Sequence, residues 1–297
     1  MLALTAVSGH SAYYFLKELE KAGYTGKIRG IKRMTSKISH LSDLKLDIEY
    51  VDAEYDDHDS MVKALNGVDT LLHIAPNTLS HKVCDAAIDA GVDWMISIQT
   101  TGKFSKFKSA AELYLKVDDE LLSKKDRIKL TVLYPTMIYG SMMDKNISKL
   151  IGFIDTHRVF PVFGKGHNLM RPVAGSDLAK AYLQILNQPD VTQNKEYVLS
   201  GEEPTRYIDI LKEVAKNLHK RVWFVMIPLN LSIFLAKIYN LVFRKALISV
   251  EQVQRMQEDK AYDHDDATRD FGYNPMTFEE GIKIQVEEYL RKKKEKK

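Results

Sequence analysis

Cysteine is almost absent from this chain, since Cys84 is the one cysteine among 297 residues. No disulfide can form within the chain, and we expect a protein of the reducing cytoplasm. The histidines lack metal-ligand spacing with cysteine or carboxylates, so the sequence predicts no metal site. The first residues also lack the basic segment that opens a secretory signal peptide.

A continuous apolar run that could span a membrane is lacking as well. The most apolar stretch, residues 223–243, has the length of a spanning helix but contains Pro228, Lys237 and two asparagines. We predict an extended segment followed by a buried or half-buried helix, with no membrane span. A helix that lies in the membrane interface is the alternative.

A large excess of charge is missing from most of the chain. Of the 43 Lys and Arg residues, six stand in the last seven positions, 291–297, and the formal net charge is only +3. This balance argues against the strongly basic surface that dominates nucleic-acid binding. We expect 291–297 to be a frayed, solvated basic tail, with contact to an anionic surface as the alternative.

Strand-like and helix-like patterns do alternate through residues 1–140. Apolar or alternating runs predict strands at 2–7, 27–32, 46–52, 68–76, 92–101 and 128–135. Helical spacing predicts a helix that ends at Gly23 and helices at 56–67, 80–91 and 109–124. This alternation indicates an α/β fold with a doubly wound parallel sheet, whose ligands bind at the carboxyl ends of the strands.

The regular alternation of strand and helix patterns stops after residue 140. Helical patterns dominate there, with short strands near 159–164, 196–201 and 222–228. We therefore predict a dinucleotide-binding domain at 1–140 and a smaller, mainly helical substrate lobe at 141–290, packed on the sheet.

The loop after the first predicted strand reads TAVSGHSA, residues 5–12. A dinucleotide loop needs small residues, because its turn is tight and its backbone approaches the pyrophosphate. Ala6 and Ala12 stand where glycine is usual, and a positive φ at Ala6 would cost about 1 kcal/mol relative to glycine. The predicted phosphate-binding residues, at the start of a helix, are Ala6, Ser8, Gly9, His10 and Ser11.

The end of the second predicted strand bears on which dinucleotide is bound. A basic residue there pairs with the 2′-phosphate of NADP, whereas a carboxylate accepts from the ribose of NAD. Because Lys32 and Arg33 stand at this place, we favour NADP over NAD, with a solvated Lys-Arg pair as the alternative. Asp52, at the end of the third strand, is expected to meet the adenine, or else to cap a turn.

Further segments resemble the extended and atypical short-chain dehydrogenase/reductase superfamily, in its epimerase/dehydratase-like branch. Besides TAVSGHSA they are LLHIAP, LYPTMIYG, VFGKGHNLMRPVAGSDLAKA and ATRDFGYNP followed by TFEEGIKIQVEEYL. They follow one another in the family's order over nearly the whole chain. The resemblance implies a Rossmann-type sheet with a nicotinamide cofactor across its strand ends. It also implies a small-molecule substrate, often a nucleotide-sugar, between the sheet and the lobe.

The same resemblance implies roles for single residues. Ala75 and Pro76 would line the cofactor, and Pro135 and Thr136 would lie near its nicotinamide. Arg171 would bind a substrate phosphate, with an ordinary surface ion pair as the alternative. Asp177 would be a structural residue of the contact between sheet and lobe.

The superfamily's catalytic pair, a Tyr and a Lys four residues later on one helix, is not intact here. The family's register puts the lysine at Lys116, but Tyr114 precedes it by two residues, which turns a helix by about 200°. We predict that Tyr114 and Lys116 point to opposite sides. In the alternative register Tyr114 faces the cofactor, and Asp118 stands in the lysine's place.

Thr100 and Thr101, at the end of the fifth strand, are candidate substrate-orienting hydroxyls, with a capping or turn role as the alternative. The candidate catalytic residues are therefore Tyr114, Thr100, Thr101 and Lys116. His73 lies inside an apolar strand and is expected to be a core histidine.

Three hypotheses follow. The first is an NAD(P)-dependent epimerase, dehydratase or reductase in which Tyr114 is the acid/base, and we favour it. The second is an NADP-binding sensor of the same superfamily that has lost turnover, since the catalytic pair is broken. The third is a scaffold whose cofactor site Ala6 and Ala12 have closed. A homodimer is compatible with all three.

Overall fold

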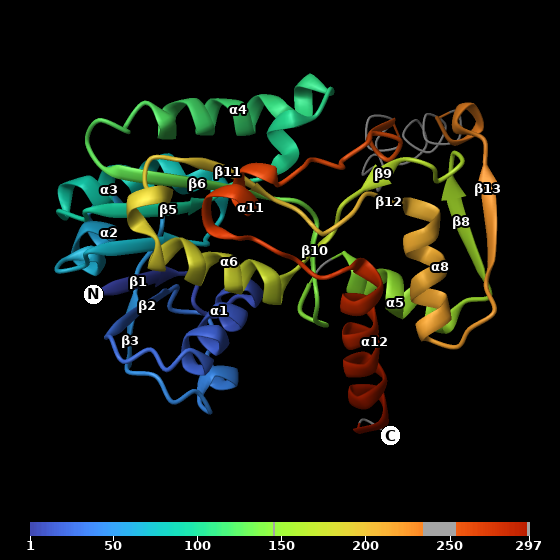
Figure 1. The fold of residues 1–297 in the computed structure, drawn as a ribbon, viewed down its shortest axis with the longest axis horizontal. Coiled ribbons are helices and arrows are strands. Elements are labelled where there is room, and N and C mark those ends of the chain that lie inside the picture. The colour runs from blue at the N-terminus through green and yellow to red at the C-terminus, as the bar shows by residue number, and fades with distance from the viewer. Residues whose placement is uncertain (145, 234–253, 296–297) are drawn as a thin grey trace.

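The computed structural model describes residues 1–144, 146–233 and 254–295. A seven-stranded, fully parallel sheet in the order β11-β6-β5-β4-β1-β2-β3 fills one half of the molecule (Figure 1). Its strands are β1 (Leu2–Thr5), β2 (Ile28–Lys32), β3 (Ile48–Asp52), β4 (Thr70–His73), β5 (Trp94–Ile98), β6 (Lys129–Pro135) and β11 (Glu196–Leu199). This is the predicted doubly wound, Rossmann-type sheet, and its strand order reverses at β1, where such sheets bind ligands.

Helices cover both faces of the sheet. One face carries α1 (His10–Lys21), α6 (Gly175–Asn187), α7 (Pro189–Thr192) and α11 (Asp265–Phe271). The other carries α2 (His58–Leu65), α3 (Ser80–Asp89) and α4 (Lys108–Leu122). The helical spacing of Phe15, Leu16 and Leu19 places all three side chains in the core under α1. Asp57 caps α2 through the Ser60 N–H, as its sequence pattern indicates.

A second core lies in the other half of the molecule, where Figure 1 shows α5, α8, α12 and a pair of strands. Its elements are α5 (Ile147–Thr156), β8 (Val159–Phe163), α8 (Tyr207–Asn217), β13 (Trp223–Ile227) and α12 (Phe278–Glu295). Short connecting elements complete the described chain: η1 (Ser39–Leu41), η2 (Asn77–Leu79), η3 (Thr101–Phe104), β7 (Ile138–Tyr139), β9 (Leu169–Met170), β10 (Val173–Ala174) and β12 (Thr205–Arg206).

Segment 141–290, predicted as the lobe, also contributes elements to the central sheet and its covering layer. β11 and α6 both come from 141–290, yet β11 is the edge strand of the central sheet and α6 packs on α1. The physical reason is the burial of β6, which is apolar on both faces and needs a neighbour along its outer edge. The lobe is the remaining part of this segment.

The apolar stretch 223–243 begins as predicted. β13 forms its extended part and a helical turn starts after Pro228, while residues 234–253 lie outside the described chain. Where the chain is described, we find no helix with the length and apolarity that crossing a membrane requires.

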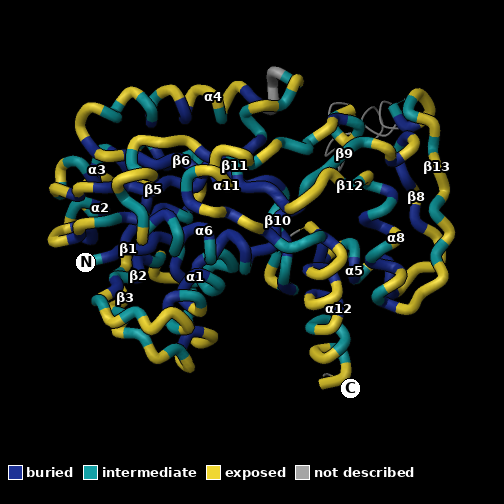
Figure 2. Tube along the Cα trace, viewed as in Figure 1, coloured by how far each residue is buried: buried dark blue, intermediate teal, exposed yellow. Residues whose placement is uncertain are grey.

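The basic tail is not frayed at its start. α12 continues to Glu295, and the Lys293 ammonium pairs with Asp155, a buried carboxylate that also accepts from the Tyr289 hydroxyl. A buried carboxylate needs such partners, and this requirement orders the start of the tail. Figure 2 shows α12 exposed along much of its length, in contrast to the buried strands of the central sheet.

Candidate functional site

The turn after β1 has the left-handed backbone that a dinucleotide loop requires. Ala6 has φ +49°, a conformation that favours glycine. Its carbonyl accepts from the Gly9 N–H at 2.8 Å, and its own N–H donates to the Tyr55 hydroxyl at 2.8 Å. Tyr55 in turn donates to the Ile31 carbonyl at 3.2 Å. The expected turn is present, and Tyr55, which the sequence pattern does not single out, holds it.

Gly9 keeps the start of α1 open. No side chain of the described residues caps this helix, so its first N–H groups are open to a ligand oxygen. A Cβ built on Gly9 would lie 3.0 Å from the Ala6 carbonyl oxygen, so a larger residue would crowd the turn. The half-buried residues around this end are Ser8, Gly9, His10 and Ser11. A phosphate group fits the arrangement.

His10 is the first residue of α1, and its side chain lies against the start of α6. Its ring meets Tyr14 edge-on with centroids 5.0 Å apart, and a Cβ built on Gly175 would lie 2.8 Å from its Cε1. Burial lowers the pKa of His10, against the attraction of Asp144 and Glu288, so the ring is neutral near pH 7. Its Nε2 is buried without a partner in the described chain.

Thr5 joins the carboxyl ends of β1 and β4. Its Oγ1 accepts from the Ile74 N–H at 2.9 Å and from the Ala75 N–H at 3.1 Å, and it lies 3.1 Å from His73 Nδ1. The hydroxyl hydrogen therefore points to Nδ1, which leaves the ring proton on Nε2. Burial lowers the pKa of His73 to about 3, so His73 is the neutral core residue expected. This contact fixes Ala75 and Pro76 beside the loop.

Lys32 and Arg33 differ in their surroundings. The Lys32 ammonium is paired with Asp52 across β2 and β3, so neither charge is free for a ligand at this point. Arg33 is exposed, and no described residue forms an ion pair with it. Of the two basic residues, Arg33 is the one available to a 2′-phosphate.

A cavity of about 510 Å³ opens at the carboxyl ends of β5 and β6. Its floor includes four of the predicted site residues, namely Thr100, Thr101, Pro135 and Thr136. The opposite wall comes from residues 255–262, more than a hundred positions along the chain. The cavity therefore lies where the sheet meets the rest of the chain, as expected for a substrate site.

The three threonines are oriented by the backbone. Thr100 Oγ1 accepts from the Gly102 N–H at 3.1 Å, Thr101 donates to the Pro135 carbonyl at 3.4 Å, and Thr136 donates to the Arg171 carbonyl. Thr100 thus caps η3, and its hydroxyl hydrogen finds no acceptor in the described chain. The capping role predicted as the alternative for Thr100 is therefore present, and its role toward a substrate stays a prediction.

Charged side chains on the far wall were missed by the sequence analysis. Arg255 and Lys260 line the cavity and form no ion pair with a described residue, and Arg255 Nε is buried without a partner there. Burial, and then the charge of Arg255, lower the pKa of Lys260, while Glu258 opposes this. Glu258 itself accepts from the Ser105 hydroxyl at 3.0 Å and the Lys106 N–H at 2.6 Å. An anionic ligand group fits this wall.

Tyr114 packs against Gly102, which lines this cavity, but is not itself among the lining residues. A Cβ built on Gly102 would lie 3.0 Å from Tyr114 Cε2 and 3.3 Å from Thr100 Oγ1, so the ring covers Gly102 beside that hydroxyl. Lys116 is not brought to the site: its side chain is 75% exposed and approaches Glu120 at 3.9 Å. The predicted opposite orientation of Tyr114 and Lys116 is confirmed, because two residues turn the helix by more than half a circle.

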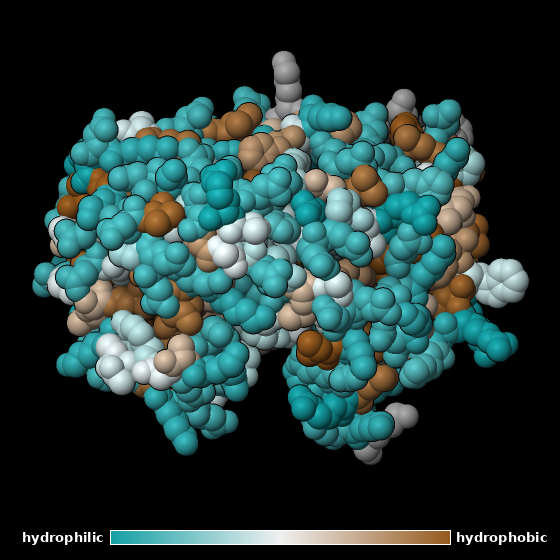
Figure 3. Space-filling view, in the orientation of Figure 1, coloured by the Kyte–Doolittle hydropathy of each residue, from teal (hydrophilic) through white to brown (hydrophobic). Residues whose placement is uncertain are grey.

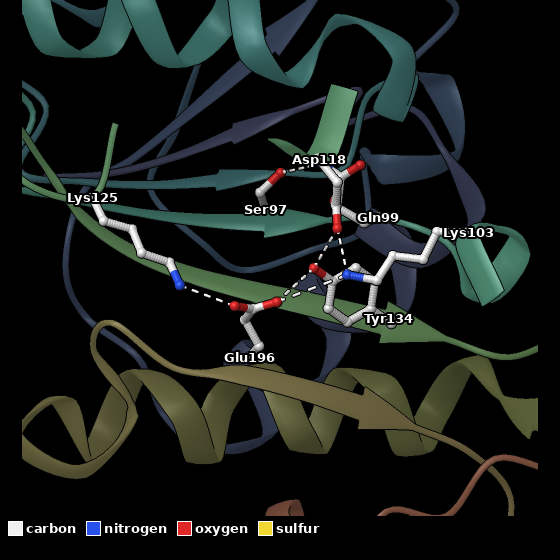
Figure 4. Close-up of polar contacts among 7 residues, drawn as sticks. All are labelled: Ser97, Gln99, Lys103, Asp118, Lys125, Tyr134 and Glu196. Atoms are coloured by element: carbon white, nitrogen blue, oxygen red, sulfur yellow. Dashed lines mark hydrogen bonds and ion pairs between the residues drawn. The ribbon is translucent and has the colours of Figure 1, made fainter. Parts of the chain in front are cut away.

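Asp118 stands four residues after Tyr114 and belongs to a buried polar network (Figure 4). Its carboxylate lies 2.5 Å from Lys103 Nζ and accepts from the Tyr134 hydroxyl at 2.7 Å. Tyr134 also lies 3.0 Å from Glu196, which pairs with Lys125 at 2.9 Å. Burial and the two carboxylates raise the pKa of Tyr134 far above its ordinary value. The network ties α4 and η3 to β6 and β11.

Comparison with solved structures finds the same architecture over the full chain. A protein called gox2253 has 15% sequence identity and a TM-score of 0.81, with 98% of each chain covered. A dTDP-glucose 4,6-dehydratase from Streptomyces venezuelae, solved with NAD bound, has 15% identity and a TM-score of 0.77, covering 99% of this chain and 98% of that one. A UDP-glucose 4-epimerase from Thermotoga maritima, solved with UDP-glucose, has 14% identity and a TM-score of 0.76 over 98% of this chain and 99% of that one.

The chain has the epimerase/dehydratase fold. The fold that the sequence resemblance implies is therefore confirmed. No family model matches the sequence, and no curated protein does either.

Two residues of the epimerase/dehydratase resemblance have clear structural places. Asp177 is buried, accepts from the Met276 N–H at 2.9 Å and so joins α6 to the approach of α12, as implied. Arg171 donates to the carbonyls of Tyr262 at 3.1 Å and Glu202 at 2.6 Å. Its two terminal nitrogens are thus held by backbone, and it is not among the residues that line the cavity.

Proposed function

We propose that this chain is a nicotinamide-dinucleotide-dependent epimerase, dehydratase or reductase that acts on a nucleotide-sugar. The observation that carries the proposal is the position of Tyr114, whose ring packs against Gly102, a residue that lines the cavity beside Thr100. A phenol on α4 and an alcohol that follows β5 can exchange a proton with a substrate hydroxyl or carbonyl.

The dinucleotide would be held by the chain's own backbone and strand ends. Its pyrophosphate would lie on the open start of α1, with Ala6 and Gly9 in the turn. The exposed charge of Arg33 supports NADP over NAD. When bound, the nicotinamide supplies reversible hydride transfer. Its neighbours would be Ala75, Pro76, Pro135 and Thr136.

The substrate would occupy the cavity between the threonines and residues 255–262. Arg255 and Lys260 would bind its diphosphate, because two cations that lack an ion-pair partner in the described chain face the same space. Thr100, whose hydroxyl hydrogen is uncommitted, would donate to the sugar oxygen at which the reaction occurs. Tyr114 would take up or return the proton of that oxygen.

The test is turnover of UDP-glucose, UDP-glucuronate and dTDP-glucose with NAD and NADP, followed by chromatography of the nucleotide-sugars. Tyr114→Phe should lower kcat by about 10²-fold or more and leave dinucleotide affinity unchanged. Tyr24→Phe, in the turn after α1, is the matched control and should turn over normally. Equal turnover by Tyr114→Phe and the unaltered chain would remove Tyr114 from the mechanism.

A dinucleotide sensor without turnover is the second candidate, and Asp118 favours it. The superfamily's lysine four residues after the tyrosine is replaced by a carboxylate already neutralised by Lys103, and Lys116 points into solvent. A sensor would bind NADPH tightly and release no product from any nucleotide-sugar. Product formation at ordinary enzyme rates would exclude it.

Two further features concern the state of the protein. Leu113 and Leu115 of α4 are 53% and 44% exposed, which supports a homodimer through this helix. Leu113→Glu should then halve the mass found by sedimentation equilibrium.

The one cysteine, Cys84, is buried and unpaired, which supports a reducing compartment such as the cytoplasm.

A further inference from the structure

The pair of strands β8 and β13 presents an apolar outer face. They are parallel, with Trp223 opposite Val159 and Val225 opposite Pro161. Phe160 and Val162 point inward to the lobe's core, so these four residues point outward. Trp223, Val159 and Val225 are 76%, 52% and 49% exposed. We call Val159, Pro161, Trp223 and Val225 the β8–β13 face.

This face departs from the usual pattern of a surface sheet. An outer face in contact with water normally carries polar residues that alternate with the apolar inner ones. Here the outer positions are apolar as well. Brown atoms gather at the edge of the molecule in Figure 3, where Figure 1 shows these strands. A contiguous apolar surface of this kind indicates a binding partner.

The surroundings of the face are basic. Arg158 and Arg221 are exposed just before the two strands, and the Trp223 N–H donates to the Arg158 carbonyl at 2.8 Å. Neither arginine forms an ion pair with a described residue. Between Glu213 and Glu251 the sequence has no acidic residue. Of the described Lys and Arg residues in this interval, Lys216 and Lys220 are ion-paired with Glu213, Glu279 and Asp155, so Arg221 is the one whose charge is available beside the face.

We propose that the β8–β13 face docks on the surface of an anionic phospholipid bilayer. Apolar side chains would enter the interface, the amphipathic ring of Trp223 would lie at the level of the headgroups, and Arg158 and Arg221 would meet lipid phosphates. A second copy of the chain fits this face less well. A two-fold contact would bring the arginines of both copies together.

The experiment uses the full chain and vesicles of two compositions, phosphatidylcholine alone and phosphatidylcholine mixed with phosphatidylglycerol. The protein should sediment with the mixed vesicles, weakly with the neutral ones, and less well as salt is raised. Bromine atoms on the lipid tails should quench Trp223. The other tryptophan, Trp94, is buried and bonded to Thr131, so it should be unaffected.

Variants separate the face from the rest of the surface. Trp223→Glu and Val225→Glu should each weaken binding to mixed vesicles at least tenfold, while Val191→Glu on α7, at another exposed apolar position, should bind normally. Trp223→Phe should still sediment but lose the quenching signal. Absence of binding to mixed vesicles, or full binding by Trp223→Glu and Val225→Glu, would overturn the proposal. So would a loss of self-association caused by Trp223→Glu without vesicles, since the face would then join two copies.

Discussion

Asp118, which stands four residues after Tyr114 on α4, has its carboxylate 2.5 Å from Lys103 Nζ. The cation in this neighbourhood is therefore supplied by η3 and not by the helix that carries Tyr114. Asp118 and Lys103 are 3% and 13% exposed, so each charge depends on the other. The pair also fixes η3, where Thr101 and Gly102 border the cavity.

Lys103→Met should destabilise the protein by about 3 kcal/mol, because it leaves the Asp118 charge buried without its cation. Chemical denaturation in urea measures the change. Replacing both residues, in Lys103→Met with Asp118→Leu, should recover much of the loss, since the unpaired charge is gone. A double variant no more stable than the single one would mean that the pair contributes through something other than its charges.

Ala6→Gly should stabilise the protein by about 0.5–1 kcal/mol, because glycine adopts a φ of +49° without strain. Thermal unfolding checks the sign. Ala12→Gly is the matched control, since Ala12 is buried inside α1, where glycine costs about 1 kcal/mol. If Ala6→Gly destabilised the protein as much as Ala12→Gly does, the left-handed turn would be in error.

His73 should make stability depend on pH below its ordinary pKa of 6.5. Burial lowers the folded pKa to about 3, so between these values only the unfolded state binds the proton. Stability from this residue is therefore complete above pH 6.5 and falls by up to about 1.4 kcal/mol per pH unit below it. His73→Asn, which keeps an acceptor for Thr5, should flatten the acid slope measured by urea unfolding. A slope unchanged in His73→Asn would refute the assignment.

Arg33→Ala should weaken NADPH binding about tenfold to a hundredfold, the value of a charge-assisted hydrogen bond, and leave NADH binding unchanged. Lys32→Met should change the NADPH-to-NADH preference far less, because Lys32 is already paired with Asp52. Calorimetric titration of both dinucleotides gives the ratio. An equal loss for NADPH and NADH in Arg33→Ala would remove the proposed 2′-phosphate contact.

Local patterns were sufficient to predict most of the central sheet. β1 through β6 each lie inside a predicted run. β1, β4, β5 and β6 are largely buried and read as short apolar segments, whereas the exposed edge strand β3 was predicted from its alternation. The turn at Ala6 was predicted from the small residues of the loop that follows β1. The short pairs β7–β10 and β9–β12 have only two residues in each strand and leave no periodic trace.

The site was predicted only where it follows the strand ends. Thr100 was proposed from its place at the end of the fifth predicted strand, and Thr136 from the family resemblance; the structure brings both to one edge, where the carboxyl ends of neighbouring parallel strands meet. Arg255 and Lys260 come from a segment without a recognisable pattern, and only the tertiary fold brings them to the cavity. Likewise, the sequence did not show that Asp118, which stands in the lysine's place, pairs with a cation. Its partner Lys103 lies fifteen residues earlier on another element.

The most direct test of the account is a titration of the full chain with NADPH and NADH, beside Gly9→Val. The account predicts that the unaltered chain binds NADPH more tightly than NADH. Gly9→Val should lose both by at least tenfold without unfolding, because its side chain crowds the Ala6 carbonyl where the pyrophosphate would lie. Binding of neither dinucleotide by the unaltered chain would contradict the central claim and leave a scaffold with the epimerase/dehydratase fold.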